Sequence, residues 1–260
     1  KADLIMAEWP LGKNKEDGSG GHVFWYEQPA DPLNQPWPRH VLAAGWDKAH
    51  DLHIGNFSEG DQPDVLVRLK DGKISWFRMP DDPRAPWIET HVTDEQPGDG
   101  TALCDITGSG SLDIATGHGY YENLDGQGGS WEFHPYSGTE DLAIDLETRV
   151  VAGDLLQDGS VVVAVAESEL LQYARLVLLH STDGGKSWAS KILVDRDRDL
   201  GALHSLQILD ADQDGRPDIF AAEMELYKED TGILRKPTWK VFLNKGGMDF
   251  AEHTVLDANL

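Results

Sequence analysis

A short unit recurs along the chain, and this repeat constrains the possible fold more than any other feature. Each copy consists of an Asp followed by a run of apolar residues. Four copies begin at Asp3, Asp64, Asp113 and Asp218, and a fifth begins at Val162, where the Asp is lost. The starting positions lie 49 to 61 residues apart. Periods of this length are typical of propeller blades and solenoid units, so we expect five similar units in the 260 residues.

Each unit also contains further segments with a strand pattern. A second β-rich segment follows the Asp-anchored one, and a third opens with an aromatic residue after a polar turn, as at Trp87 and Trp131. Another segment precedes the anchored strand in every unit but the first, starting at His50, Asp99, Thr148 and His204. Alternating apolar and polar positions bounded by Gly, Asp, Asn and Pro indicate short antiparallel strands, and no segment has helical periodicity.

These patterns predict an all-β fold, a β-propeller of about five four-stranded blades, with the first blade lacking its innermost strand. We expect one propeller domain over residues 1–260, with blades at roughly 1–45, 46–95, 96–140, 141–196 and 197–260. The missing strand would come from beyond Leu260, or the chain would be part of a longer propeller. We favour the second alternative, because an unpaired strand position exposes an edge.

The composition limits the classes of partner. The chain has 46 acidic and 22 basic residues and a net charge of −24, and such a surface repels phosphate backbones and anionic lipid. We therefore expect no nucleic-acid partner, and the sequence contains no apolar run long enough for membrane insertion. The single cysteine, Cys104, excludes an internal disulfide and a thiolate cluster. The acidic surplus serves solubility or a need to hold cations.

One loop has the pattern of a calcium site. Asp210, Asp212, Asp214 and Asp218 alternate along a loop that contains Gly215. Carboxylates at this spacing converge on one point, and hard oxygen ligands suit Ca²⁺; the alternative is a solvated acidic turn. The corresponding loops keep fewer carboxylates, and we expect side-chain hydrogen bonds to hold their turns instead. Their matching residues are Asn56, Ser58, Gly60 and Asp64, then Asp105, Thr107, Ser109 and Asp113, then Asp154 and Asp158.

The loops and the segment Asn244-Lys-Gly-Gly-Met-Asp-Phe250 together resemble the FG-GAP/VCBS propeller families, whose blades carry a DxDxDGxxD loop and an N-x-G-[DG]-x-x-F turn. The resemblance implies a calcium-loop propeller, and we expect a secreted or periplasmic protein. A second segment, Ser181 to Trp188, is similar to the Asp-box of sialidase-type propellers, which is a structural turn. The sequence has no recognisable arginine triad, so this likeness does not imply sialidase activity.

The expected topology places one candidate pocket. If the calcium-type loops lie on one face, the starts of the first strands and the ends of the second strands converge near the axis on the other face. Candidate catalytic residues there are His50, His118, His204, Tyr120 and Arg149, and candidate substrate-binding residues are Glu8, Trp9, Trp46, Arg68, Glu167 and Glu223. Its His and Glu side chains could also hold a second divalent ion. The alternatives are the polar lining of any wet channel and, for both Trp residues, burial in the core.

Two functions fit these residues. The first is a calcium-stabilised propeller that binds or acts on carbohydrate, with a glycan or small sugar as the partner and a protein partner also open. The second, which the resemblance implies, is a lyase that cleaves uronic-acid glycans by β-elimination. In that reaction His50 or His204 would be the base, Tyr120 or Tyr121 the acid, and Arg149 or a divalent ion would hold the substrate carboxylate.

Overall fold

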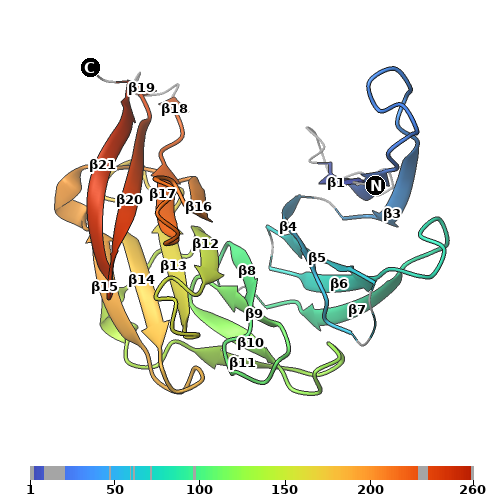
Figure 1. Ribbon diagram of the computed structural model, residues 1–260, viewed down its shortest axis with the longest axis horizontal. Coiled ribbons are helices and arrows are strands. Elements are labelled where there is room, and N and C mark those ends of the chain that lie inside the picture. The colour runs from blue at the N-terminus through green and yellow to red at the C-terminus, as the bar shows by residue number, and fades with distance from the viewer. Residues whose placement is uncertain are drawn as a thin grey trace. The chain divides into compact units, whose positions relative to one another are not determined.

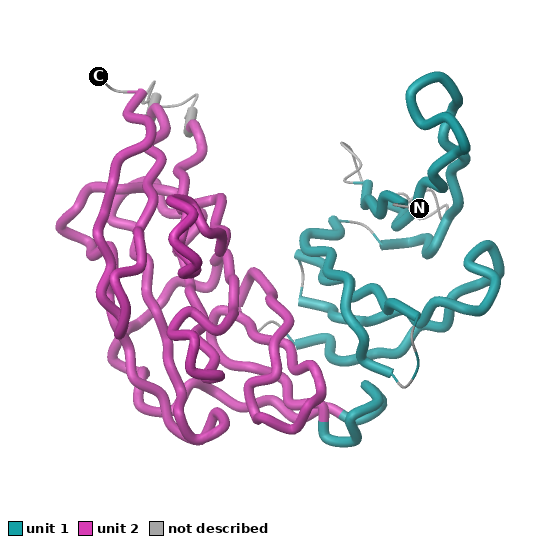
Figure 2. The backbone as a smooth tube through the Cα atoms, viewed as in Figure 1, with its two compact units in different colours: residues 1–96, 124–130 teal, residues 97–123, 131–260 magenta. Residues whose placement is uncertain are grey.

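The computed structural model describes residues 3–8, 21–46, 48–58, 60, 62–70, 72–95, 98–227 and 234–258. The chain divides into two compact units (Figure 2): unit 1 comprises residues 1–96 and 124–130, and unit 2 comprises residues 97–123 and 131–260. The described residues form strands, loops and two short 3-10 turns, η1 (Glu140–Leu142) and η2 (Arg196–Arg198), with no α-helix among them. The prediction of an all-β fold is therefore confirmed, and no helix in the described part is long and apolar enough to cross a membrane.

Five antiparallel sheets of three or four strands account for the repeat (Figure 1). Unit 1 holds sheet 1, made of β1 (Leu4–Ala7), β2 (His22–Tyr26) and β3 (Arg39–Ala44), and sheet 2, made of β4 (Ala49–Gly55), β5 (Asp64–Leu69), β6 (Ile74–Arg78) and β7 (Ile88–Thr93). Unit 2 begins with sheet 3, which consists of β8 (Thr101–Cys104), β9 (Asp113–Thr116), β10 (Gly119–Asn123) and β11 (Trp131–Pro135).

Unit 2 continues with two larger sheets. Sheet 4 contains β12 (Thr148–Gly153), β13 (Val161–Glu167), β14 (Leu176–Ser181) and β15 (Ala189–Val194). Sheet 5 contains β16 (Ser205–Leu209), β17 (Asp218–Ala222), β20 (Thr238–Gly246) and β21 (Asp249–Asp257). A two-stranded hairpin of β18 (Leu226–Tyr227) and β19 (Leu234–Arg235) interrupts the repeat between β17 and β20, and the sequence patterns did not predict it.

Strand order within each sheet follows chain order, as in a series of antiparallel hairpins. The register places each anchoring Asp at the start of its strand, opposite the last residue of the preceding one: Gly55 pairs with Asp64, Cys104 with Asp113 and Leu209 with Asp218. In sheet 1 the described strands are three, and β1 pairs with β2 through Leu4 and Tyr26.

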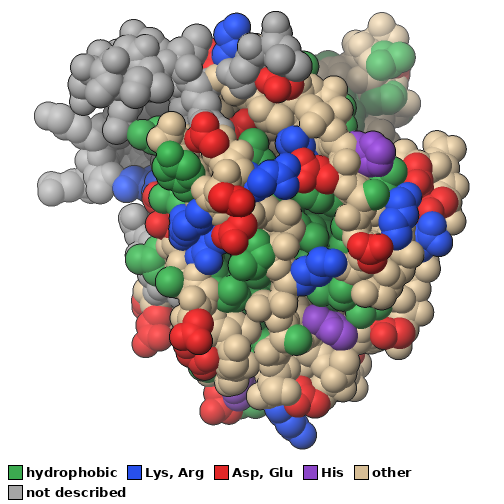
Figure 3. All heavy atoms as spheres, turned by 90° about the vertical axis from the view of Figure 1, so that its left-hand side faces the viewer, with side chains coloured by type: hydrophobic (Ala, Val, Ile, Leu, Met, Phe, Trp, Pro, Cys, Tyr) green, Lys and Arg blue, Asp and Glu red, His purple; other side chains and the backbone are tan. Residues whose placement is uncertain are grey.

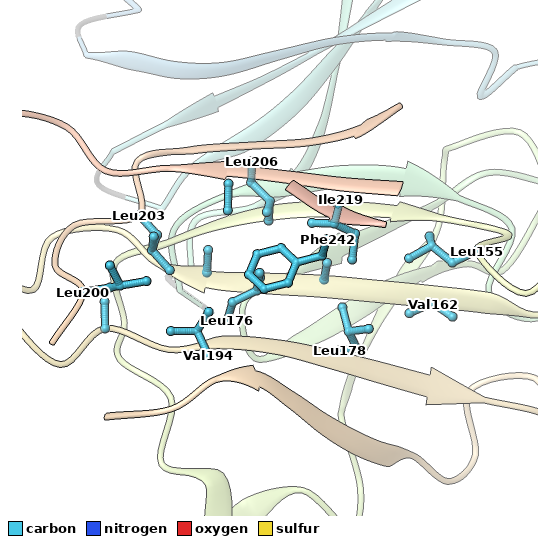
Figure 4. Packing of buried hydrophobic residues seen from close by; sticks show 14 residues of the cluster. Leu155, Val162, Leu176, Leu178, Val194, Leu200, Leu203, Leu206, Ile219 and Phe242 are labelled. Atoms are coloured by element: carbon cyan, nitrogen blue, oxygen red, sulfur yellow. The ribbon is translucent and has the colours of Figure 1, made fainter. Parts of the chain in front are cut away.

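The core of unit 2 lies on both faces of sheet 4. On one face, Val162 and Ala164 of β13 pack in a cluster with Ile219 and Phe242 of sheet 5. Figure 4 shows the ring of Phe242 at the centre of this cluster. On the other face, Val163 of β13 joins a cluster that includes Cys104 and Tyr120 of sheet 3. Because neighbouring side chains point to opposite faces and both faces are covered, β13 is a continuous apolar run.

The core of unit 1 lies between sheets 1 and 2. Val23 and Trp25 of β2 pack with Val65 and Val67 of β5 in one buried cluster that also contains Phe77. The three buried clusters themselves consist of apolar residues. On the face seen in Figure 3, acidic, basic and apolar side chains are interspersed, so the acidic surplus forms no single large patch there.

Candidate functional site

A buried aspartate fastens the loop that precedes it in three of the sheets. Asp64, Asp113 and Asp218 are almost completely buried at the starts of β5, β9 and β17. In each case Oδ2 accepts backbone N–H groups from the preceding loop, which come from Phe57 and Ser58, from Ile106 and Thr107, and from Ala211, at 2.8 to 3.1 Å. Hydrogen bonding to the folded loop thus explains why Asp recurs at this position.

The second oxygen of two of these aspartates, Asp113 and Asp218, reaches another strand. Oδ1 of Asp113 accepts the N–H of Asn123 in β10 at 3.0 Å, and Oδ1 of Asp218 accepts the N–H of Asn244 in β20 at 2.8 Å. Burial raises the pKa of Asp113 above its ordinary value, and this effect outweighs the hydrogen bonds from Asn123, Thr107 and Ile106. The anchoring aspartates therefore stabilise the fold through these hydrogen bonds, whether or not the loops also bind an ion.

The first acidic position of each loop closes its turn. Asp105 accepts the N–H groups of Ser109 and Gly110, Asp154 those of Asp158 and Gly159, and Asp210 those of Asp214 and Gly215, all at 2.8 to 3.1 Å. In the loop of sheet 2, the amide of Asn56 donates to the oxygen of Gly60 at 2.7 Å. The expectation that side-chain hydrogen bonds hold the less acidic turns is confirmed.

The loop of sheet 5 differs because three carboxylates converge in it. Ligand oxygens of Asp210, Asp212 and Asp218 lie within 4.8 Å of one another, the one such group of three or more His, Cys, Asp or Glu ligands among the described residues. Ca²⁺ binds oxygen at 2.3 to 2.6 Å, so oxygens at this separation fit around one ion. Asp214 stands apart, because its carboxylate accepts the N–H of Arg216 and pairs with its guanidinium. Nζ of Lys245 lies 3.8 Å from Oδ2 of Asp212.

The glutamates at the strand ends of sheets 4 and 5 bond to the protein itself. Glu167 is 1% exposed. Its Oε2 accepts the N–H of Arg175 at 2.8 Å, and its Oε1 accepts the N–H of Asp145 at 3.0 Å. Oε1 also forms ion pairs with the guanidinium groups of Arg175 and Arg196. Glu223 accepts the N–H groups of Gly201 and Thr238. Both are predicted to bind substrate, and in the folded chain both also accept backbone hydrogen bonds at the ends of their sheets.

A polar cluster in unit 2 joins the starts of β12 and β16. Nη2 of Arg149 lies 2.5 Å from Nε2 of His204, and Nε of Arg149 donates to the backbone oxygen of His204 at 3.2 Å. Oε1 of Glu169 lies 3.2 Å from the same Nε2. This nitrogen can accept from Arg149 or donate to Glu169 but cannot do both at once, so the tautomer of His204 decides which contact is a hydrogen bond. About a third of the His204 side chain is exposed.

The other predicted catalytic residues of unit 2 have different surroundings. His118 contacts the loop before β12, since Nε2 lies 3.0 Å from the backbone oxygen of Asp145, and a Cβ atom at Gly98 would overlap the imidazole ring. Tyr120 is buried in β10 and stacks on His134 at a centroid distance of 5.1 Å. Burial, followed by the nearby carboxylates of Glu122, Asp113 and Asp183, raises the pKa of Tyr120 to about 12.

Unit 1 contains a second histidine cluster. Nδ1 of His50 lies 3.4 Å from Oδ1 of Asp51, and Nη1 of the fully buried Arg68 lies 4.0 Å from Oδ2 of Asp51. Burial acts to raise the pKa of Asp51, but the hydrogen bond from His50 and the charges of His50, Arg68 and His53 outweigh it and hold the pKa below its ordinary value. His50 thus lies in unit 1, and His118 and His204 lie in unit 2.

The remaining predicted binding residues also lie in unit 1. Trp46 is 3% exposed and packs on Phe77 at a centroid distance of 5.3 Å, so it belongs to the core. Nζ of Lys73 lies 4.2 Å from the centroid of the Trp46 ring. Glu8 pairs with His22 at 3.0 Å and with Arg39 at 2.5 Å. Trp9 lies outside the described residues.

The segment similar to an Asp-box forms a tight turn between β14 and β15. The carboxylate of Asp183 accepts hydrogen bonds from the hydroxyl of Ser181 at 2.9 Å and from both the N–H and the hydroxyl of Ser187. In the same turn, Nε1 of Trp188 donates to the backbone oxygen of Gly185 at 3.0 Å. The hydrogen bonds from Ser187 are the largest cause that lowers the pKa of Asp183 to about 2. A polar cavity of about 410 Å³ adjoins this turn and is lined by Tyr120, Glu122, His134, Asp183 and Lys186, among others.

A scan against family models finds no family that matches this chain, and a search of curated proteins finds no match either.

Sequence reasoning missed three charged residues of these clusters. Asp51 follows His50 directly, and Glu169 lies two positions beyond Glu167. Because Glu169 lies only two positions after Glu167, the sequence could have placed it near the same strand end. The third, Arg196, reaches Glu167 at 2.9 Å from the turn η2, and no local pattern links residues that far apart.

Proposed function

We propose that the chain is a calcium-stabilised β-propeller of the FG-GAP/VCBS kind that serves as a carbohydrate-binding scaffold. The observation that carries the metal part is the convergence of Asp210, Asp212 and Asp218 in one loop. The serial packing of sheets 3, 4 and 5 supports the propeller part, since sheet 4 is covered on both faces by its neighbours.

Each aspartate of this loop has a distinct role. Asp210 and Asp218 are needed for the turn without an ion, because their equivalents Asp105 and Asp113 make the same hydrogen bonds in the less acidic loop of sheet 3. Asp212 accepts one long bond, from the N–H of Asp214 at 3.3 Å. Removal of Asp212 therefore tests metal binding with the least damage to the fold.

The test is thermal unfolding with Ca²⁺, with Mg²⁺ and with chelator. At a Ca²⁺ concentration of about a hundred times Kd, the folded state should gain about 2.7 kcal/mol. Asp212→Ala should remove most of this gain, and Lys245→Met should increase it because the competing ammonium is lost. Asp158→Ala, in the neighbouring loop, is the matched control and should respond to Ca²⁺ like the parent chain. An unchanged Ca²⁺ response in Asp212→Ala, or equal responses to Ca²⁺ and Mg²⁺, would contradict the proposal.

The carbohydrate part rests on the cluster of Arg149, His204 and Glu169, which combines a cation, a base and a carboxylate in a partly exposed position. A guanidinium suits the carboxylate of a uronic acid. A calcium scaffold of low affinity suits the high Ca²⁺ of an extracellular or periplasmic setting, and we place the protein there. Calorimetry with uronic-acid oligosaccharides should show binding that Arg149→Ala abolishes, whereas binding unchanged in that variant would exclude this cluster.

The same cluster favours a second candidate function, β-elimination on a uronic-acid glycan. Neutral His204 would take the proton next to the substrate carboxylate, and Arg149 would stabilise the enolate that forms. Collapse of the enolate would form the double bond and break the bond to the β-oxygen, and the leaving oxygen would take a proton from water. The test is the ultraviolet absorbance of an unsaturated uronate product. His204→Gln should abolish the signal and His91→Gln, on the exposed edge strand β7, should not. Binding without any product would leave the scaffold function and reject the lyase.

A further inference from the structure

In sheet 1, a carboxylate, an imidazole and a guanidinium form one polar group. His40 of β3 lies opposite Trp25 of β2 and stacks on its ring at a centroid distance of 4.4 Å. Oε2 of Glu27, two positions after Trp25, lies 3.3 Å from Nε2 of His40. Arg84, from the turn between β6 and β7 of sheet 2, donates to both oxygens of Glu27, from Nη2 at 2.6 Å and from Nε at 3.2 Å. This contact is the largest cause that lowers the pKa of Glu27, so the guanidinium completes the group.

Sheet 3 contains the same carboxylate and imidazole without the guanidinium. His134 of β11 lies opposite Tyr120 of β10 and stacks on its ring at a centroid distance of 5.1 Å. Oε2 of Glu122, again two positions after the aromatic residue, lies 2.9 Å from Nε2 of His134. The corresponding turn of sheet 4, between β14 and β15, carries the exposed Lys186. Among the described residues, however, His134 is the only side chain that pairs with Glu122.

The polar cavity of about 410 Å³ in unit 2 adjoins this incomplete pair. Tyr120, Glu122 and His134 of sheet 3 line one side of it, and residues 183–186 of the turn in sheet 4 line another. In unit 1, the guanidinium of Arg84 lies at the corresponding place, between the carboxylate of sheet 1 and the turn of sheet 2. The volume of the cavity is within the range of small-molecule sites.

The charges around this cavity favour a cation. Glu122 and Asp183 contribute two carboxylates to its lining, against the single ammonium of Lys186. Asp183 is ionised at neutral pH, because hydrogen bonds from Ser187 above all lower its pKa to about 2. The pKa of Tyr120 is raised first by burial and then by nearby carboxylates, which include Glu122 and Asp183. A positive charge placed between these carboxylates is therefore stabilised.

We propose that this cavity binds a small guanidinium compound, whose planar group lies on Glu122 as Arg84 lies on Glu27. A guanidinium presents paired N–H donors that match the two oxygens of one carboxylate, whereas an ammonium acts as a point charge. Asp183 suits a second positive charge at the other end of the ligand. The site shares no residue with the cluster of Arg149, His204 and Glu169, so it is independent of the proposed glycan binding.

The test is calorimetric titration of agmatine, a guanidinium joined to an amine by a short alkyl chain, into the full 260-residue chain. Saturable binding at one site is expected. N-carbamoylputrescine has the same length and amine but a neutral urea group in place of the guanidinium, so it should bind at least about tenfold more weakly. A blocked tripeptide with a central arginine should also bind more weakly than agmatine. Binding of the tripeptide alone would indicate a protein partner and overturn the proposal.

Three variants locate the binding. Glu122→Gln keeps the shape of the side chain but removes its charge, and should weaken agmatine binding at least about tenfold. The matched control is Glu132→Gln, which removes the same charge from an exposed residue opposite Glu122 that does not line the cavity. This control should change the affinity by less than about twofold. Lys186→Ala removes the competing ammonium and should strengthen binding.

Several outcomes would overturn the proposal. One is that agmatine does not bind the parent chain, and another is that the urea analogue binds equally well. Equal losses of affinity in Glu122→Gln and Glu132→Gln would mean that agmatine binds the acidic surface in general. Binding that is detected only in Lys186→Ala would mean that Lys186 itself fills the site, and would also overturn the proposal.

Discussion

The side-chain amide of Asn244 donates to the backbone oxygen of Leu155 at 2.6 Å and so ties sheet 5 to the loop of sheet 4. The same amide donates to the oxygen of Pro217 at 3.0 Å, and its own Oδ1 accepts the N–H of Gly246 at 2.8 Å. The side chain of Asn244 is almost completely buried. The Asn of the N-x-G turn thus connects two neighbouring sheets by a hydrogen bond.

Asn244→Ala should lower the free energy of unfolding by about 2 to 4 kcal/mol, because it leaves two buried carbonyl oxygens without their donor. Urea denaturation measures this directly. Asn34→Ala, in an exposed turn whose amide bonds Asp31, is the control and should cost about 0.5 kcal/mol. An equal decrease in the free energy of unfolding in the two variants would show that the hydrogen bonds of Asn244 contribute little to stability.

Glu167→Ala should destabilise the chain by about 3 to 5 kcal/mol, because it leaves the guanidinium of Arg175, which is 7% exposed, without its carboxylate. Glu223→Ala should also destabilise the chain, because it removes the acceptor of the backbone N–H groups of Gly201 and Thr238. Denaturant midpoints of the two variants test both losses. If both variants fold with unchanged stability but lose glycan binding, the glutamates are ligand contacts and their structural role is refuted.

Asp183 should make the stability of the turn depend on acid pH. Its pKa is lowered from an ordinary value near 4 to about 2, so its stabilising effect is present above pH 4 and is lost as the pH falls through 2. Asp183→Asn should lower Tm at pH 7, and the difference from the parent chain should shrink towards pH 2. A Tm difference that is constant from pH 7 to pH 2 would be inconsistent with titration of this carboxylate.

Cys104 should be unreactive in the folded chain. Burial, together with the charges of Asp113 and Asp105, raises its pKa far above the ordinary value of a thiol, and the thiolate is the reactive form. Modification by a thiol reagent should be at least about a thousandfold slower in buffer than in urea. Rapid labelling in buffer, with Tm unchanged, would mean that β8 opens locally.

The repeat allowed much of the fold to be predicted. Asp64, Asp113 and Asp218 mark the starts of strands because a buried carboxylate at that point satisfies two loop or strand N–H groups, a local requirement that leaves a sequence pattern. The roles of Glu167 and Tyr120 were harder to predict. Glu167 satisfies N–H groups of two loops, and Tyr120 faces the neighbouring sheet, so both depend on packing between segments that are distant in sequence.

The arrangement of the proposed metal site was partly predictable for a similar reason. Alternate spacing indicated that carboxylates would converge, and three of the four do so. Asp214 pairs with Arg216, two residues away, so a local cation competes with the loop for its charge. The hairpin of β18 and β19 belongs to one unit only, and a repeat comparison cannot predict an element that it finds once.

The hydrogen bonds of Asp105 and Asp210 have a consequence for how such loops can change. Because each turn closes on its own backbone N–H groups, its shape does not require an ion, and an acidic pair can be added to or removed from it while the sheet keeps its register. Thr107 and Ser109 occupy the places of Asp212 and Asp214 in a turn of the same construction. The proposed metal site would therefore be a property of a single loop, which two substitutions would transplant from sheet 5 to sheet 3.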